Sequence, residues 1–268
     1  MKTTSYASKV VWIISVLVLG ACAGKENPIA LQPVNPEQDS SIVDLFEKLG
    51  DGAAAGPITL YSAVIAQGVP DKVAKKAFEK YDEFSAKVRN ATNIVIVDFS
   101  QHSKNKRFYF VNRASGKVEQ WSVAHGTGTD PDNDGYAQYF SNVPESHMSS
   151  LGSYLIQEKY LSEKFGESLR LDGLEKTNSN VRDRAIVLHP STYVKDGLTK
   201  QGRSWGCPAI PYDYIKSVVA RAANGTFMYA FGINKRSAAL DTQALQQWNL
   251  IPRSLWTDES EAAPIFGE

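Results

Sequence analysis

The chain has 268 residues with 29 basic and 29 acidic side chains, so its formal net charge is zero. Because the charges balance, the protein has no net positive field that would attract nucleic acid, and no acidic excess indicates a solvating acidic tail. Hydrophobic residues make up 43% and aromatic residues 10%, enough for a sizeable core, and the length suits one domain with appendages or two small domains.

The first residues are typical of an export signal. Lys2 and Lys9 precede an apolar run over residues 10–21, which is too short for a membrane-spanning helix of about 20 residues but suits a signal peptide. The run ends in Leu-Gly-Ala directly before Cys22, which resembles the bacterial lipobox. We expect residues 1–21 to be a lipoprotein signal peptide and Cys22 to carry lipid, including palmitate. The alternative is an ordinary secretory signal with an incidental cysteine.

Lipidation of Cys22 would leave Cys207 as the single thiol of an exported protein. Ala23 rather than aspartate follows Cys22, which resembles the outer-membrane sorting pattern, so we expect a lipid-anchored periplasmic protein at the outer membrane. An odd cysteine in an exported protein pairs with another chain, is buried and inert, or is reactive. The residues around Cys207 therefore decide its role.

After the lipidation site the chain changes from a tether to helices. Residues 22–40 are rich in proline, asparagine, glutamine and charge, which predicts a flexible tether. Residues 41–92 have a helical pattern. We expect a short helix at 42–49 and an amphipathic helix at 71–88, where apolar side chains recur every three or four residues.

The body that follows, residues 93–232, is rich in β-strand patterns. Residues 125–183 are predicted to be a long connection, which in a compact domain is usually functional. The fold class is mainly β with a few helices (α+β), and residues 233–268 form a weakly patterned C-terminal extension with a short helix at 241–248. The predicted strands are 93–99, 107–112, 118–124, 184–189 and 226–232, with a turn at Ser115–Gly116 and a helix at 212–225.

Cys207 lies in the segment GRSWGCPAI, between Gly206 and Pro208 and shortly before a predicted helix. Glycine permits close approach of a substrate or another backbone, and a helix N-terminus favours the thiolate of a nearby cysteine. The N–H groups of Gly206 and Cys207 could point at one oxygen, as an oxyanion hole requires. The position suits a nucleophile, with a buried structural cysteine as the alternative.

A thiol nucleophile needs a base, and the chain has four histidines. His102 and His147 lie in polar loops, which predicts solvated side chains. His125 and His189 each end a predicted strand, and His189 would emerge from the sheet at a loop mouth. By pattern alone each could be a surface or rim histidine.

Spacing distinguishes His189 from the other histidines. Fourteen residues separate His189 from Ser204, which begins the run Ser204-Trp205-Gly206-Cys207. This order resembles the signature of the L,D-transpeptidases (YkuD-type catalytic domain). That signature is a histidine, fourteen to seventeen residues, serine or threonine, histidine, glycine and cysteine.

The departures from that signature match one branch of the family. Trp205 replaces the inner histidine, and Pro208 and Ala209 replace the usual residues after the cysteine. The segment GRSWGCPA is characteristic of the murein L,D-transpeptidase catalytic domain proteins. Residues 140–160 and 167–175, together with IVIVDFS, VAHG and RAIVLH, are also similar to that branch, so the resemblance covers roughly residues 90–232. Pro190 is a local departure, because glycine more often follows the histidine.

The resemblance implies a barrel-like or sandwich-like β catalytic domain over residues 93–232, and it implies roles by position. Cys207 would be the nucleophile, and His189 the general base and then acid, oriented by a main-chain carbonyl. Ser204 would support the loop, and the N–H groups of Gly206 and Cys207, with Trp205, would hold the oxyanion. Expected substrate-binding residues are Arg203, Trp205, Ser149 and Ser150, with a surface arginine and a core tryptophan as alternatives for the first two.

The resemblance further implies acyl transfer on peptidoglycan stem peptides without a metal or organic cofactor. The thiolate would attack diaminopimelate at the third position of a tetrapeptide, D-alanine would leave, and an amine would resolve the thioester. A second stem, water or a protein amine could be the acceptor. Alternatives are an L,D-carboxypeptidase or endopeptidase that trims murein, a non-catalytic wall-binding lipoprotein, and a cysteine protease. We expect the protein to associate with the membrane through its lipid and not to bind nucleic acid. The oligomeric state stays open.

Residues 130–135, DPDNDG, resemble the start of an EF-hand calcium loop, with Asp130, Asp132 and Asp134 at alternate positions. The twelfth position is Ser141 rather than glutamate, and no helix is predicted before the loop. We therefore expect a polar loop of Asx turns and no metal.

Overall fold

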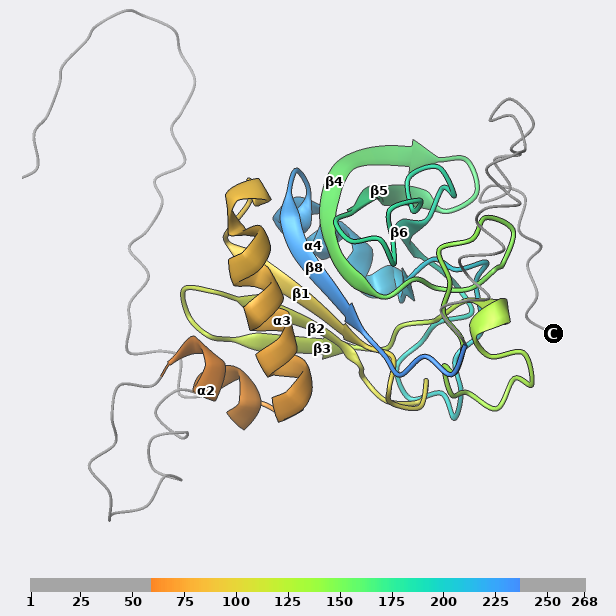
Figure 1. Ribbon diagram of the computed structural model, residues 1–268, viewed down its shortest axis with the longest axis horizontal. Coiled ribbons are helices and arrows are strands. Elements are labelled where there is room, and N and C mark those ends of the chain that lie inside the picture. The colour runs from red at the N-terminus through yellow and green to blue at the C-terminus, as the bar shows by residue number, and fades with distance from the viewer. Residues whose placement is uncertain (1–58, 237–268) are drawn as a thin grey trace, which may run out of the picture. The chain divides into compact units, whose positions relative to one another are not determined.

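A computed structural model describes residues 59–236 of the chain (Figure 1). The predicted signal peptide, the tether, the helix at 42–49 and the helix at 241–248 lie outside these residues. Within them, the helices are α2 (Leu60–Ala66), α3 (Asp71–Phe84) and α4 (Tyr212–Ala222), with 3-10 helices at Ser85–Lys87 and Thr127–Thr129. The strands are β1 (Asn93–Asp98), β2 (Phe108–Asn112), β3 (Val118–Trp121), β4 (Gly152–Ser162), β5 (Gly166–Gly173), β6 (Val187–Pro190), β7 (Ala209–Ile210) and β8 (Thr226–Phe231).

These strands form one sheet in the order β3-β2-β1-β8-β4-β5-β6-β7. Pairs are antiparallel except β1 with β8 and β6 with β7, which are parallel. Beyond β3, isolated bridges join Ala124 to Ala209 of β7 and Gly126 to Ser204. These bridges bring the two edges of the sheet together in a nearly closed barrel. This mainly β architecture with few helices confirms the fold class expected from the sequence.

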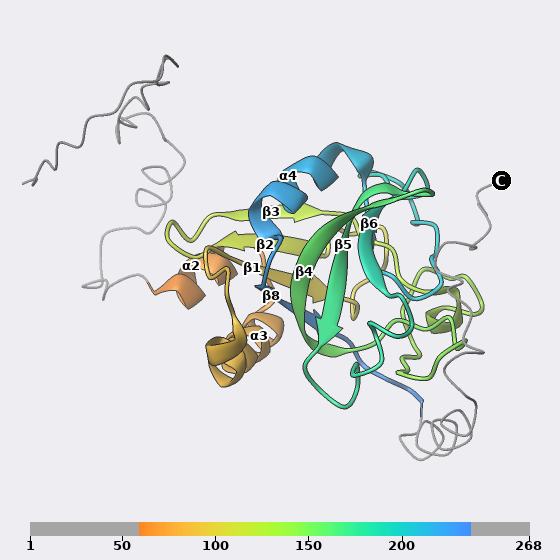
Figure 2. The ribbon, with the colours of Figure 1, turned by 90° about the horizontal axis from the view of Figure 1, so that it is seen from above.

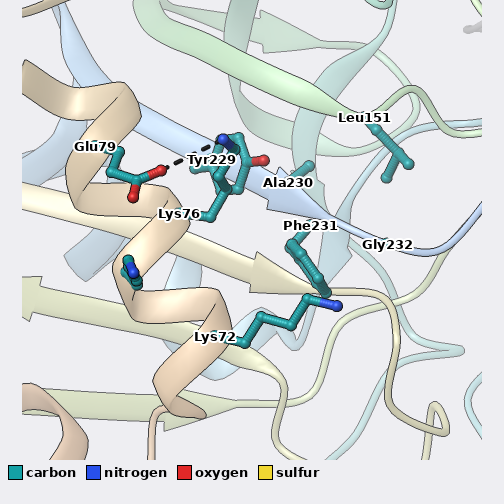
Figure 3. Close-up of a pocket in the computed structure, with 9 residues that line it drawn as sticks. Lys72, Lys76, Glu79, Leu151, Tyr229, Ala230, Phe231 and Gly232 are labelled. Atoms are coloured by element: carbon teal, nitrogen blue, oxygen red, sulfur yellow. Dashed lines mark hydrogen bonds and ion pairs between the residues drawn. The ribbon is translucent and has the colours of Figure 1, made fainter. Parts of the chain in front are cut away.

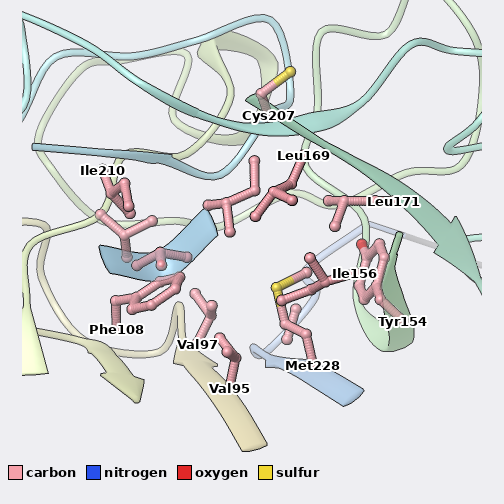
Figure 4. Packing of buried hydrophobic residues seen from close by; sticks show 14 of the residues in the cluster. Val95, Val97, Phe108, Tyr154, Ile156, Leu169, Leu171, Cys207, Ile210 and Met228 are labelled. Carbon is pink, nitrogen blue, oxygen red and sulfur yellow. The ribbon is translucent and has the colours of Figure 1, made fainter. Parts of the chain in front are cut away.

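Side chains of the central strands alternate between the barrel interior and an outer helix layer. On β1, Val95 and Val97 belong to the interior cluster (Figure 4), whereas Ile94 and Ile96 pack with residues of α2 and α3. Helix α4 contributes to the interior cluster and α3 to the outer one. The two helices therefore cover opposite faces of this part of the sheet (Figure 2).

Helix α3 confirms the amphipathic helix predicted at 71–88, with the 3-10 helix Ser85–Lys87 as its continuation. Its buried face consists of Val73, Ala74, Ala77 and Tyr81, and the Tyr81 ring meets Phe227 edge-on at 5.5 Å. These helices and the sheet belong to one compact unit. Within residues 59–236, we find no helix that combines the length and the hydrophobicity needed to span a bilayer.

The segment 125–183 is not the long connection expected from the sequence, because it contains β4 and β5. The first six residues of β4 are all buried, so this strand lacks the alternation of buried and exposed residues that marks a half-buried strand. A register shift between Ile156 and Lys159 further interrupts the period of two. The expectation of a long connection without strands over these residues is therefore wrong.

Phe227 tests the packing of α3 on the sheet, because its side chain is fully buried between them. We predict that Phe227→Ala lowers the free energy of unfolding by about 3–5 kcal/mol through lost contacts and a cavity. Leu161→Ala, at a side chain that is 79% exposed, should change it by less than about 0.5 kcal/mol. Urea denaturation measures both, and equal losses would contradict this packing.

Candidate active site

Cys207 lies beside strand β6 because β7 pairs with that strand. The parallel register puts His189 opposite Ala209, so Cys207, two residues earlier than Ala209, comes next to Val187. The Val187 N–H donates to Cys207 Sγ at 3.4 Å, and the cysteine is 5% exposed. The sulfur points away from the other labelled side chains of the interior cluster (Figure 4). An N–H donor on sulfur favours the thiolate, whereas burial opposes it.

His189 lies on β6 two residues after Val187 and is 1% exposed. Its Nδ1 is 2.9 Å from the Pro190 carbonyl oxygen, which can only accept, so Nδ1 carries the proton and Nε2 is the basic nitrogen. Burial lowers the pKa of His189 to about 4; the Pro190 hydrogen bond opposes this effect, and the charge of Lys164 adds to it. The ring is neutral at pH 7. The structure thus brings a thiol next to the strand that carries a basic imidazole nitrogen.

The turn before Cys207 is held by Ser204. The Ser204 Oγ donates to the Cys207 carbonyl at 2.7 Å and accepts the Gly206 N–H at 3.1 Å. Gly206 has a φ of +116°, and an added Cβ would lie 2.8 Å from the Met148 carbonyl oxygen, so both conformation and space require glycine. Ser204 supports the turn. The Gly206 N–H already donates to Ser204 Oγ, so the expectation that it holds an oxyanion stays a prediction that requires exchange of this hydrogen bond.

Ser149 and Ser150 belong to the frame beneath this turn. Both are 2% exposed. The Ser149 Oγ accepts the Gly126 N–H and donates to the Gly206 carbonyl, each at 3.0 Å. The Ser150 Oγ donates to a main-chain carbonyl at 2.8 Å and accepts from Arg184 at 2.8 Å. Both hydroxyls are engaged in hydrogen bonds within the protein, which favours a supporting role over the substrate contact expected from the sequence.

Arg203 and Trp205 reach to loops on either side of the turn. The Arg203 guanidinium donates to the Asp130 carbonyl. The Trp205 indole stacks on the His147 imidazole, with ring centroids 4.4 Å apart and planes 13° from parallel. Both side chains are partly exposed. They lie on the segment that leads into Cys207, where a peptide could reach them.

His125 belongs to a buried network behind the turn. Arg107 is fully buried and places Nη2 2.7 Å from His125 Nδ1. A guanidinium can only donate, so Nδ1 accepts and the Nε2–H donates to Asp130 at 3.2 Å. Burial lowers the pKa of His125 to about 4, opposed by the hydrogen bond to Asp130. The His125 carbonyl accepts the Ser204 N–H at 2.9 Å, so this network also positions the turn.

Residues 65–231 match the family described as L,D-transpeptidase catalytic domain. The chain belongs to this family. The match spans more than half of the chain and confirms the family recognised in the sequence. No curated protein matches the chain significantly.

Several solved structures of L,D-transpeptidases are similar to this chain at low identity. The Mycobacterium smegmatis enzyme has 11% identity and a TM-score of 0.35, over 53% of this chain and 59% of that protein. The Stackebrandtia nassauensis enzyme has 19% identity and a TM-score of 0.33, over 68% and 70%. L,D-transpeptidase 3 of Mycobacterium tuberculosis has 12% identity and a TM-score of 0.36, over 53% and 61%. The assignment therefore rests on the family match.

Two aromatic side chains next to the candidate site of this L,D-transpeptidase domain are missed by the sequence analysis. The Phe165 ring stacks on His189, with centroids 3.8 Å apart and planes 26° from parallel. Tyr193 packs against Ala209 of β7 and Ala124, and burial raises the pKa of its phenol, with the negative charge of a Cys207 thiolate adding to the effect. Both lie outside the periodic segments that predicted strands, so only their aromatic character could have pointed to them.

The acidic loop of the L,D-transpeptidase domain is ordered by its own backbone. Asp130 accepts the Asp134 N–H and the Gly135 N–H, each at 3.0 Å, in addition to His125. Oxygens of Asp130, Asp132 and Asp134 lie within 4.8 Å of one another. Because Asp130 is buried and already accepts these bonds, the loop is explained by the Asx turns expected from its sequence.

A separate pocket of about 410 Å³ lies where α3 faces the end of β8 (Figure 3). Lys76 pairs with Glu79 at 3.3 Å on its rim, and the Lys72 ammonium lies 5.7 Å from the Phe231 ring centroid. None of the site residues predicted from the sequence lines this pocket. Its lysines are the exposed face of an amphipathic helix, and the pocket does not contribute to the candidate site.

Gly206→Ala tests whether the turn needs glycine. We predict a loss of about 2–4 kcal/mol in the free energy of unfolding, because the added Cβ meets the Met148 carbonyl in a left-handed conformation. Gly197 also has a positive φ but no atom within 4 Å of an added Cβ, so Gly197→Ala should cost about 1–2 kcal/mol. Chemical denaturation of both variants measures the difference, and a smaller loss for Gly206→Ala would contradict the crowding.

The two buried histidines predict acid sensitivity. Both pKa values are about 4 in the folded state, below the ordinary 6.5, so the unfolded state takes up protons first as the pH falls. The free energy of unfolding should therefore decrease between about pH 6.5 and pH 4, by on the order of 3 kcal/mol for each histidine.

Urea titrations across this pH range measure the effect. His189→Gln should reduce the pH dependence by about one proton relative to the unsubstituted protein, which separates the histidine from the carboxylates that titrate nearby. An unchanged pH dependence in that variant would contradict a neutral buried His189.

Proposed function

We propose that this chain is a peptidoglycan L,D-transpeptidase that acts through a thioester at Cys207. One observation carries the proposal. The pairing of β6 with β7 holds the Cys207 sulfur at the Val187 N–H, and His189, with Nε2 unprotonated, follows two residues later on the same strand. Membership of the L,D-transpeptidase family supports a stem tetrapeptide with diaminopimelate at its third position as the acyl donor.

In the first half-reaction, His189 Nε2 takes the proton of the Cys207 thiol. The thiolate attacks the carbonyl carbon of diaminopimelate, and the carbonyl oxygen becomes an oxyanion. The resemblance to the family implies that N–H groups of the turn ending at Cys207 stabilise it, and of these the Gly206 N–H is held by Ser204 in this conformation. The peptide C–N bond then breaks, His189 returns its proton to the leaving amine of D-alanine, and a thioester stays on Cys207.

In the second half-reaction, an acceptor amine attacks the thioester carbonyl. His189 takes a proton from the amine, the C–S bond breaks, and the proton returns to the sulfur. A second stem as acceptor gives a 3→3 cross-link. The near-complete burial of His189 and Cys207 supports an amine rather than water as the acyl acceptor, since a site that excludes bulk water protects the thioester from hydrolysis.

In this proposal, side chains at the rim of the site contact the substrate. The partly exposed Trp205 indole, stacked on His147, offers an apolar wall for the peptide. Arg203 could bind a substrate carboxylate if it released the Asp130 carbonyl, because its fork geometry suits a carboxylate. Ser149 and Ser150 position the turn without touching substrate.

We also propose that the protein acts in the periplasm, anchored to the outer membrane through lipid on Cys22. The apolar run before Leu-Gly-Ala-Cys22 and the tether-like composition of residues 22–40 support this location. An anchor of this kind would keep the domain within reach of murein. The mass of the mature N-terminus, with or without diacylglycerol, tests it.

Purified protein incubated with disaccharide-tetrapeptides tests the activity. We expect cross-linked dimers together with released D-alanine by mass spectrometry. Cys207→Ala should lower both more than about 1,000-fold. The same substitution should change the free energy of unfolding by only about 1 kcal/mol, so unfolding curves serve as the control for a folded variant.

Other outcomes of the same experiment identify the alternatives. Release of D-alanine without dimers indicates an L,D-carboxypeptidase, and no product with retained murein binding indicates a wall-binding lipoprotein. Dimer formation that survives in Cys207→Ala would contradict the cysteine mechanism.

A further inference from the structure

The turn between β4 and β5, residues 162–166, is built to hold a fixed shape. The Ser162 Oγ accepts the N–H groups of Lys164 and Phe165 at 3.3 Å and 3.2 Å. Gly166 has a φ of +74°, and Ser162 pairs with Gly166 at the end of the strand ladder. These hydrogen bonds present the side chains of Lys164 and Phe165 in one arrangement.

Phe165 covers the proposed catalytic base. Its ring stacks on the His189 imidazole with centroids 3.8 Å apart, and Phe165 itself is 9% exposed. Strand β5 pairs with β6 through Leu169 and Leu188, one residue before His189, which brings the β4–β5 turn to the end of β6. The turn is therefore a wall of the candidate site.

Lys164 and the His189 imidazole both lie against the Phe165 ring. The Lys164 ammonium lies 5.5 Å from the Phe165 ring centroid, and the side chain is partly buried. Among residues 59–236, no carboxylate forms an ion pair with it. Burial lowers the pKa of Lys164, and its positive charge is felt at His189. A partly desolvated cation beside a base that must become cationic is unfavourable unless an anion arrives.

We infer that Lys164 is a substrate-binding residue whose ammonium receives the α-carboxylate of the residue that leaves the acyl donor. This inference rests on the proposed function, because the leaving D-amino acid brings a free carboxylate to within a few bonds of the carbonyl that Cys207 attacks. The carboxylate would sit against the cation over the Phe165 ring. It would neutralise the charge that opposes protonation of His189, so the base would strengthen when a correct donor binds.

The matched control lies on the same hairpin. Lys159 is an exposed lysine of β4, and its ammonium pairs with Glu167 of β5 at 3.1 Å. Lys159→Gln removes the same charge as Lys164→Gln but from a site that already has its anion. Lys164→Arg keeps the charge and should keep the preference for a carboxylate.

Binding to Cys207→Ala protein tests the inference without requiring turnover. The ligands are a stem tetrapeptide with a free C-terminal carboxylate and the same peptide as its C-terminal amide, compared by calorimetry. We expect the carboxylate form to bind about 10- to 100-fold more tightly. That ratio should fall to near one when Lys164→Gln is added and persist when Lys159→Gln or Lys164→Arg is added.

Turnover separates the two proposals. In the otherwise unsubstituted enzyme, Lys164→Gln should raise KM for the free-carboxylate donor with a smaller change in kcat, and should leave the amide donor largely unaffected. Equal binding of both peptides, or a preference that survives Lys164→Gln, would overturn the inference even if dimers form. A lysine-dependent preference in a protein that makes no thioester would overturn the acyl-transfer proposal and leave the carboxylate site standing.

Discussion

The parallel pairing of two very short strands, β6 and β7, is the constraint on which the candidate site depends. It places Cys207 next to Val187 and His189 opposite Ala209, so a thiol and an imidazole eighteen residues apart in sequence share one edge of the sheet. The bridge from Ala124 to Ala209 closes the barrel at the same place. Because β7 is hydrogen-bonded on both sides, the segment that carries the nucleophile has little freedom to move away from the base.

Small polar groups and close backbone contacts keep the turn before Cys207 in position. Within the turn, the Ser204 Oγ donates to the Cys207 carbonyl. The Ser149 Oγ links the Gly206 carbonyl to the Gly126 N–H. Behind them, the neutral His125 bridges a buried arginine and a buried carboxylate, which satisfies groups whose burial alone would be costly. The frame is therefore polar and nearly complete without substrate. The rim residues Arg203, Trp205 and Lys164 are partly exposed, so they are the part of the site that a substrate can reach.

The sequence predicted the features that follow from local pattern and fixed spacing. Strand β1, the hairpin of β2 and β3, helices α3 and α4, and the spacing of His189 and Cys207 all have such signals. Strands β4 and β5 do not, because full burial and a register shift remove their alternation. The frame role of Ser149 and the contact of Phe165 with His189 come from tertiary pairing between distant segments. No periodicity within either segment reports such a contact.

A covalent intermediate is the most direct consequence of a thiol held at the Val187 N–H, two residues before a basic imidazole on the same strand. Rapid acid quenching of the protein with a tetrapeptide donor, followed by intact-mass and peptide mass spectrometry, measures it. We expect a mass gain equal to the donor minus D-alanine, located on the peptide that contains Cys207. D-alanine release with no such adduct, or an adduct on another residue, would contradict it.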